Sequence, residues 1–136
     1  MTALLDTDFL LALLARNDHL HDVCAMALDH EPEPLVPNVI LPELAYLIVR
    51  DMGYQPFLRF MDAVLAGSPP LVMATAADYT RATEMMSRYA DSRIDFVDCV
   101  IAAVAERLKV TRILSLDHRH FSLFRPDHCD TFEVVP

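Results

Sequence analysis

The segment "RIDFVDCVIAAVAERL", residues 93–108, sets two carboxylates three residues apart at the head of an apolar stretch with helical periodicity. Asp95 and Asp98 either start a helix or hold a ligand. Asp is favoured at helix N-caps by backbone hydrogen bonding and by the helix dipole, although the capping box prefers Glu or Gln at its last position. On a helical wheel Asp98 borders the apolar face and Asp95 points outward. We therefore interpret Asp95 mainly as a helix cap and Asp98 as a ligand. The predicted apolar face consists of Val97, Ile101, Val104, Ala105 and Leu108.

Three more carboxylates stand next to the boundaries of predicted elements. Asp6 directly follows the first apolar run, and Asp117 directly follows the run "RILSL". Glu43 stands next to Pro42, which is tolerated in the first turn of a helix, so Glu43 is expected near a helix N-terminus. Taken singly, each of these acids fits an ordinary turn or cap.

The elements that position these acids follow from hydrophobic periodicity. Short apolar runs predict strands, and longer periodic stretches predict helices. The predicted strands cover residues 3–5, 35–36, 71–73, 112–116 and 132–135, and the predicted helices cover residues 7–16, 19–30, 42–51, 56–66, 76–89 and 95–109. This alternation predicts an α/β domain with a mainly parallel sheet. Ligands bind such sheets at the carboxyl ends of the strands, where the four acids are expected to meet.

Four carboxylates in one cleft require compensation. Two like charges about 4 Å apart repel by about 4 kcal/mol at an effective dielectric constant near 20. Protons or a cation must offset this repulsion. Carboxylate oxygens, without a paired Cys or a helical His pair, favour Mg²⁺ or Mn²⁺ over zinc.

Four motifs in this order resemble the PIN-domain nucleases and, within them, the VapC-type toxins of bacterial toxin–antitoxin pairs. The motifs are "LLDTDFLLALL", "PNVILPELAYLI", "FVDCVIAAVAERL" and "ILSLDHRHF". The resemblance covers essentially the whole chain. It implies a three-layer α/β/α fold with a mainly parallel central sheet, and one nuclease domain over residues 1–136.

The resemblance also implies a Mg²⁺- or Mn²⁺-dependent endoribonuclease, the toxin of a type II toxin–antitoxin system. The implied metal-binding and catalytic residues are Asp6, Glu43, Asp98 and Asp117. Asp8, Asp95 and Ser115 are accessory candidates. The polar turn after Asp117 offers His118, Arg119 and His120 as substrate contacts.

The net charge of −9 argues against a broad basic surface for nucleic acid, so any RNA contact is expected to be local. An acidic cleft suits a basic partner, and the resemblance implies a VapB-type antitoxin.

No leader or membrane span is recognised, and three scattered cysteines fit a reducing cytoplasm. Apolar side chains between residues 19 and 66 favour a homodimer, namely Met26, Leu28, Tyr46, Leu47, Phe57, Phe60 and Met61.

Three alternatives stay open. His118, His120 and the pair His128-Cys129 allow a zinc site, which needs three or four converging ligands. Asp6-x-Asp8 allows a Mg²⁺-dependent phosphatase with an aspartyl nucleophile, although Lys109 is predicted at the wrong end of its helix for that chemistry. The third alternative is an inactive interaction module that keeps the PIN fold.

Overall fold

The strands of the computed structural model, which describes residues 2–136, form one five-stranded parallel sheet. All five predicted strands are confirmed, and their order across the sheet is β3-β2-β1-β4-β5. Every pairing between neighbouring strands is parallel. The strands are β1 Thr2–Leu5, β2 Glu33–Pro37, β3 Leu71–Val72, β4 Arg112–Leu114 and β5 Glu133–Val135.

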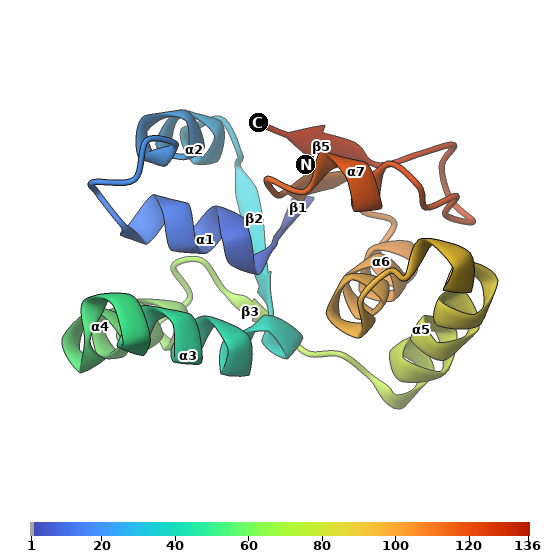
Figure 1. Cartoon of the computed structure of the whole chain (residues 1–136), viewed down its shortest axis with the longest axis horizontal. Coiled ribbons are helices and arrows are strands. Elements are labelled where there is room, and N and C mark those ends of the chain that lie inside the picture. Colours follow the sequence, from blue (N-terminus) through green and yellow to red (C-terminus); the bar gives the residue numbers. More distant parts are fainter. Residues whose placement is uncertain (1) are drawn as a thin grey trace.

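Helices lie on both sides of this sheet, which confirms the three-layer α/β/α architecture. Figure 1 shows α1 to α4 on one side and α5 and α6 on the other. The α-helices are α1 Thr7–Leu14, α2 His21–Asp29, α3 Leu41–Met52, α4 Tyr54–Leu65, α5 Ala76–Arg88, α6 Phe96–Leu108 and α7 His118–Phe121. Two 3₁₀ turns, η1 Asn38–Ile40 and η2 Ala90–Ser92, precede α3 and α6. Residues 118–121 were predicted as a turn, and the structure makes them the short helix α7. No helix among residues 2–136 is long and apolar enough to cross a membrane.

The winding of the chain puts a switch in strand order between β1 and β4. From β1 the chain moves to β2 and β3 at one edge, and then returns to β4 and β5 on the other side of β1. Leu5 is in register with Leu114, so the residues that follow the two strands are neighbours. Open parallel sheets bind ligands at such a switch point, on the carboxyl edge.

Helix α6 is buried on all sides rather than along one stripe. All eight residues from Asp98 to Ala105 are buried, whereas Leu108, which we predicted on the apolar face, is 38% exposed. The prediction of a single apolar face is therefore wrong. Helix α5 packs on α6, and the rest of the hydrophobic core covers its other sides. Cys24 in α2 and Cys99 in α6 are buried and pack as small apolar side chains.

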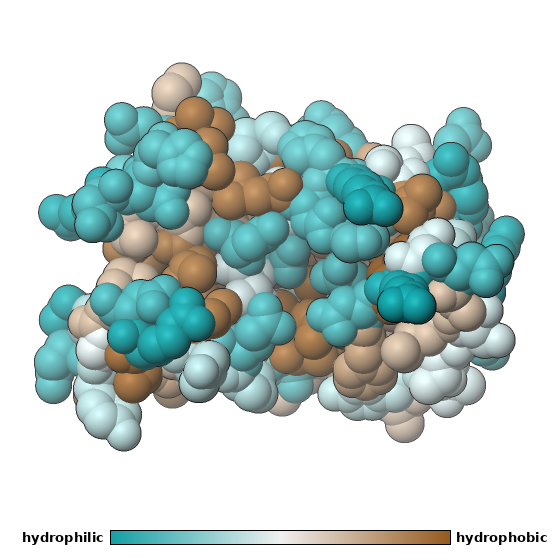
Figure 2. All heavy atoms as spheres, in the orientation of Figure 1, coloured by the Kyte–Doolittle hydropathy of each residue, from teal (hydrophilic) through white to brown (hydrophobic). Residues whose placement is uncertain are grey.

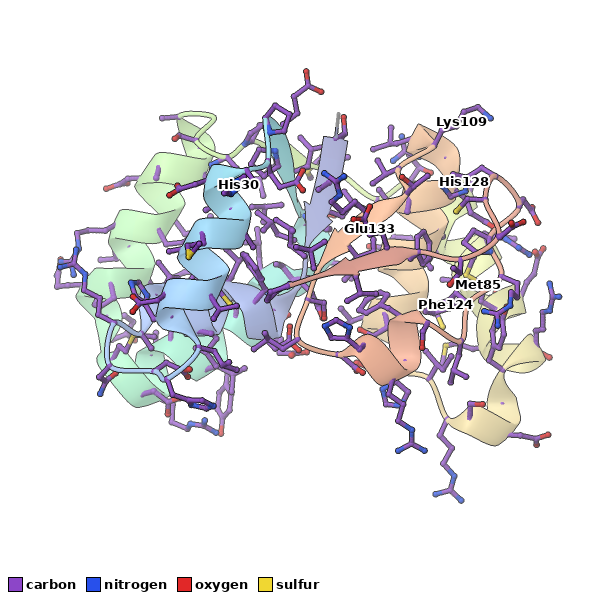
Figure 3. The ribbon with its side chains drawn as sticks, turned by 90° about the horizontal axis from the view of Figure 1, so that it is seen from above. His30, Met85, Lys109, Phe124, His128 and Glu133 are labelled. Carbon is purple, nitrogen blue, oxygen red and sulfur yellow. The ribbon has the colours of Figure 1, made fainter. Side chains whose placement is uncertain are left out.

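Two local features hold the layers around the sheet. Gly53 has φ 90° and ψ −178°, a backbone region open essentially to glycine alone, and joins α3 to α4 as a single residue. On the opposite side, Phe124 packs against Tyr89, Phe121 and Phe132. Figure 3 shows Phe124 and Met85 close together in this part of the core. Phe121 and Phe124 thus anchor the segment after β4 to the core.

Candidate metal-binding active site

Acids from four separate regions of the chain line one cleft of about 240 Å³. Its lining consists of Asp6, Thr7, Asp8, Glu43, Asp95, Val97, Asp98, Asp117 and His120. Figure 2 shows hydrophilic side chains gathered over the middle of this face, between α1 and α3 on one side and α6 and α7 on the other. The structure thus brings Asp6, Glu43, Asp98 and Asp117 together at the carboxyl edge of the sheet.

Ser115 ties the ends of β1 and β4 together beneath the cleft. Its hydroxyl is fully buried and donates to Asp6 Oδ2 at 2.8 Å and to Asp8 Oδ1 at 3.3 Å, while it accepts the backbone N–H of Asp117 at 2.9 Å. Asp8 Oδ1 also accepts the backbone N–H of Leu116 at 3.1 Å. Asp8 and Ser115 therefore position other acids of the cleft.

The short helix α7 brings Asp117 and His120 to the same side. Asp117 is the N-cap of α7 and accepts the backbone N–H of His120 at 3.0 Å. Its second oxygen lies 2.7 Å from His120 Nδ1. Ligand atoms of Asp98, Asp117 and His120 all lie within 4.8 Å of one another, a spacing that suits a single cation. We predicted His120 as a substrate contact and, in the zinc alternative, as a ligand together with His118, His128 and Cys129. The structure groups it instead with Asp98 and Asp117, and the only sequence signal for this was the short spacing Asp117-x-x-His120.

Asp95 occupies the N-cap position of α6, but its side chain makes no capping hydrogen bond. Its interpretation as mainly a helix cap is therefore not supported, because the carboxylate lines the cleft instead.

Glu43 lies in the first turn of α3, directly after Pro42, as predicted. Thr7 also lines the cleft, and its buried hydroxyl has no hydrogen-bond partner among the described residues. We did not predict Thr7 as a site residue, because a threonine between two acids matches no metal-binding pattern.

Burial and mutual repulsion raise the pKa of the acids deepest in the cleft. Desolvation, followed by the charges of Asp95 and Asp117, raises the pKa of Asp98 to about 7. Burial also raises the pKa of Asp6 well above its usual value, and the charges of Asp8 and Asp98 add to this, against hydrogen bonds from Ser115 and Thr7. The pKa of Glu43 is raised in the same direction by burial and by Asp95. Without a cation, the cleft is expected to retain protons near neutral pH.

The remaining candidates lie apart from the cleft. His118 Nε2 bonds to the backbone oxygen of Pro136, and Arg119 is exposed on α7. His128 bonds to the backbone oxygen of Val110 at 2.6 Å, and Figure 3 shows it beside Lys109 at the C-terminal end of α6. Within residues 2–136, His128 and Cys129 are not part of the group Asp98, Asp117 and His120, which removes the basis for the zinc site.

The aspartyl phosphatase alternative requires a lysine near Asp6 and Asp8, and among residues 2–136 the structure does not place one there. Lys109 is the C-cap of α6, thirteen helical residues beyond Asp95 at the other end of that helix. At 1.5 Å per residue, this separation is on the order of 20 Å. Lys109 therefore lies too far from Asp6 and Asp8 to bind a phosphoryl group held there.

Comparison with known proteins is consistent with this geometry. The PIN domain family matches residues 3–125 of the chain. The chain belongs to the PIN domain family. PIN domains form a family of hydrolytic nucleases for which metal dependence is characteristic. The donors of this PIN domain, mainly carboxylate oxygens with one imidazole, fit a hard divalent cation.

Several VapC proteins resemble this PIN domain over most of their length. Ribonuclease VapC26 of Mycobacterium tuberculosis is 30% identical over 134 residues, 98% of this chain and 99% of that protein. M. tuberculosis VapC20, a sarcin–ricin loop cleaving toxin, is similar with a TM-score of 0.80 and 22% identity, over 87% of this chain and 92% of that one. VapBC2 of Rickettsia felis, solved with a DNA fragment from its promoter, is similar with a TM-score of 0.72 and 14% identity, and the match covers 100% of both chains. FitAcB of Neisseria gonorrhoeae is similar with a TM-score of 0.64 and 14% identity, over 85% of this chain and 87% of that one.

Proposed function

We propose that this PIN domain is a metal-dependent endoribonuclease and the toxin of a toxin–antitoxin pair. The observation that carries the proposal is the meeting of Asp6, Glu43, Asp98 and Asp117 in one small cleft at the switch point of the sheet. The 30% identity to a ribonuclease over nearly the whole chain supports RNA as the substrate. An inactive interaction module is disfavoured, because such a module has no need for carboxylates whose burial and mutual repulsion raise their pKa values.

The cation of the site is Mg²⁺ or Mn²⁺ in this proposal. Asp6, Asp98, Asp117 and Glu43 hold it directly or through water, and His120 completes the set on the side of α7. Carboxylate oxygens suit both cations, and an imidazole ligand shifts the preference toward Mn²⁺. When bound, the cation would polarise the phosphodiester and activate a water for in-line attack.

The protein groups then have separate tasks. Ser115 fixes the orientation of Asp6 and, through the backbone of Asp117, the start of α7. One of the cleft carboxylates accepts the proton of the attacking water. Asp8 and Asp95 add negative charge at the rim and keep the cation in the cleft.

Substitution of a cleft acid by its amide tests the proposal. Asp6→Asn and Asp98→Asn keep the side-chain volume and remove the charge, so each is expected to lower RNA cleavage with Mg²⁺ or Mn²⁺ by at least about 100-fold. Cleavage of a fluorescent RNA with and without EDTA measures this loss, and circular dichroism checks the fold. Glu84→Gln, an exposed acid on α5 outside the cleft, is the matched control. Undiminished metal-dependent cleavage in both cleft variants would exclude the mechanism.

We further propose that a VapB-type antitoxin with basic side chains binds this chain in the cytoplasm and inhibits it at the acidic cleft. The free cysteines suit a reducing compartment. A separate groove of about 700 Å³ between α1, α2 and α4 offers an apolar binding surface, lined by Leu10, Leu13, Leu14, Leu28 and Phe60. Titration with the product of a neighbouring reading frame should abolish cleavage.

The proposal of a homodimer rests on large apolar side chains that the fold leaves exposed on α2, α3 and α4. Of the seven side chains considered from the sequence, Met26 is 64% and Tyr46 66% exposed, whereas Phe60 is buried at 7%. Tyr54 and Leu65 are 71% and 70% exposed. Light scattering of the purified chain measures its oligomeric state.

A further inference from the structure

Two aromatic rings stack on each other beside the N-terminal end of α6, whose first turn lines the acidic cleft. Tyr79 of α5 and Phe96 of α6 have ring centroids 6.0 Å apart and an interplanar angle of 9°. Phe96 directly follows Asp95 and directly precedes Val97, and both of these line the cleft. The pair therefore adjoins the site of the proposed chemistry.

Packing does not explain why these rings lie at the surface. Phe96 and Tyr79 are each 39% exposed, and Phe96 is the one phenylalanine among residues 2–136 with more than a third of its surface open to solvent. Stacking two half-exposed rings leaves apolar faces in water, which is unfavourable unless something else covers them. The exposed parts of the two rings are therefore suited to contact a ligand.

The positions of both rings are fixed before any ligand arrives. Tyr79 follows the capping box of α5, in which Thr75 and Asp78 bond to each other's backbone N–H groups. Arg107 holds Asp78 with hydrogen bonds of 3.0 and 3.1 Å. Phe96 is the first residue of α6, which is the most buried helix of the domain. A preorganised aromatic surface loses little conformational entropy on binding.

We propose that Tyr79 and Phe96 form a stacking platform for an unpaired base of the RNA, next to the phosphodiester held in the acidic cleft. This inference rests on the proposed ribonuclease function and deepens it by naming a subsite for one unpaired base of the RNA. Double-stranded RNA keeps its bases stacked on one another, so only an unpaired base can reach the rings.

Electrostatics favours an RNA base as the occupant. A chain of net charge −9 gains little from phosphate contacts over its whole surface, so affinity for RNA must come from local contacts, among which base stacking needs no positive charge. Stacking of a base on an aromatic ring contributes about 1–3 kcal/mol and tolerates any base. Arg93, two residues before Asp95, is exposed and makes no ion pair among the described residues. Its guanidinium is therefore free to bind a phosphate beside the stacked base.

Steady-state cleavage of a short single-stranded RNA tests the platform. Phe96→Ala is expected to raise KM about tenfold with kcat unchanged within about twofold, because stacking contributes to binding in both the ground state and the transition state. Phe96→Trp restores KM, and Phe96→Leu, which is apolar but not aromatic, does not. Leu108→Ala, at the other end of α6 and 38% exposed, is the matched control and leaves KM unchanged.

An RNA with an abasic nucleotide beside the cleaved bond separates this inference from a structural effect. The abasic substrate should raise the KM of the wild type as much as Phe96→Ala does, and should add nothing further in that variant. Equal KM values for wild type and Phe96→Ala would overturn the platform. A changed molar mass of Phe96→Ala in light scattering, with KM following protein concentration, would overturn it in favour of a contact between copies. Absence of any RNA cleavage by the wild type would instead defeat the proposed function itself.

Discussion

At the scale of single residues, the most informative contacts converge on a hydroxyl rather than on a carboxylate. Ser115 bonds to Asp6 and Asp8 and to the backbone of Asp117, and it has no exposed surface. Mutation of a group that orients a metal ligand commonly lowers metal affinity or activity by about 10- to 100-fold. Ser115 thus belongs to the machinery of the site although it need not touch the substrate.

Removal of this hydroxyl should weaken both the site and the fold. Ser115→Ala is expected to lower cleavage by about 10- to 100-fold and to reduce the free energy of unfolding by about 1–3 kcal/mol, because Asp6 loses a buried hydrogen bond. Ser115→Thr keeps the hydroxyl and should recover most of the activity. Urea denaturation and cleavage rates measure the two effects. Full activity of Ser115→Ala would contradict the positioning role.

The titration of Asp98 predicts an unusual dependence of stability on pH. Its pKa is about 7 in the folded protein and 3.8 in the unfolded reference, so the folded protein binds the extra proton between these values. Stability of the metal-free protein should therefore fall as the pH rises from about 4 to 7, by at most roughly 4 kcal/mol at 1.36 kcal/mol per pH unit. Asp78 and Glu106 are paired acids with lowered pKa values, so their stabilisation grows as the pH rises to about 5 and is constant above that.

Thermal melting in EDTA at several pH values between 4 and 8 measures this fall. Asp98→Asn should flatten the curve in part, because one titrating group is gone while Asp6 and Glu43, whose pKa values are also raised, remain. Saturating Mg²⁺ should also flatten it, because the cation takes the place of the proton in neutralising the cleft. A wild-type protein that becomes more stable over this range in EDTA would contradict the assignment.

At the scale of elements, sequence periodicity located every strand and the six long helices, because each of these has a clear apolar pattern. The short helix α7 escaped prediction because "HRHF" has one apolar residue and no periodicity. The burial of α6 also escaped, since Ala102, Ala103 and Cys99 are small enough to pack on any side of a helix. What surrounds a helix is set by tertiary structure and not by its own sequence.

The junction between α3 and α4 predicts a purely conformational effect. Nothing lies within 4 Å of a Cβ atom added at Gly53, so Gly53→Ala strains the backbone without a steric clash. The free energy of unfolding should fall by about 1–3 kcal/mol while the cleavage rate per folded molecule stays the same. Chemical denaturation together with active-site titration tests this. Asp51→Ala, on the surface two residues earlier, is the control and should leave stability nearly unchanged, because its ion pair with Arg50 is exposed to solvent.

At the scale of the whole molecule, the candidate site was predictable to the extent that topology determines it. The parallel sheet brings Asp6, Glu43, Asp98 and Asp117 to one edge, and that could be inferred from alternating strands and helices. The side-chain geometry within that edge could not, which is why Asp95 was assigned to capping and His120 to the substrate. Contacts such as Ser115 with Asp6 depend on the register of β1 and β4, and residues 109 apart in sequence carry no local signal for it.

That distance along the chain has a consequence for the cell that makes this protein. Asp6 leaves the ribosome early, whereas its partners beside β4 are synthesised more than a hundred residues later. A growing polypeptide therefore lacks a complete cleft, and hydrolytic competence begins only when translation of this region is nearly finished. The nascent chain therefore carries no assembled acidic cleft through most of its synthesis.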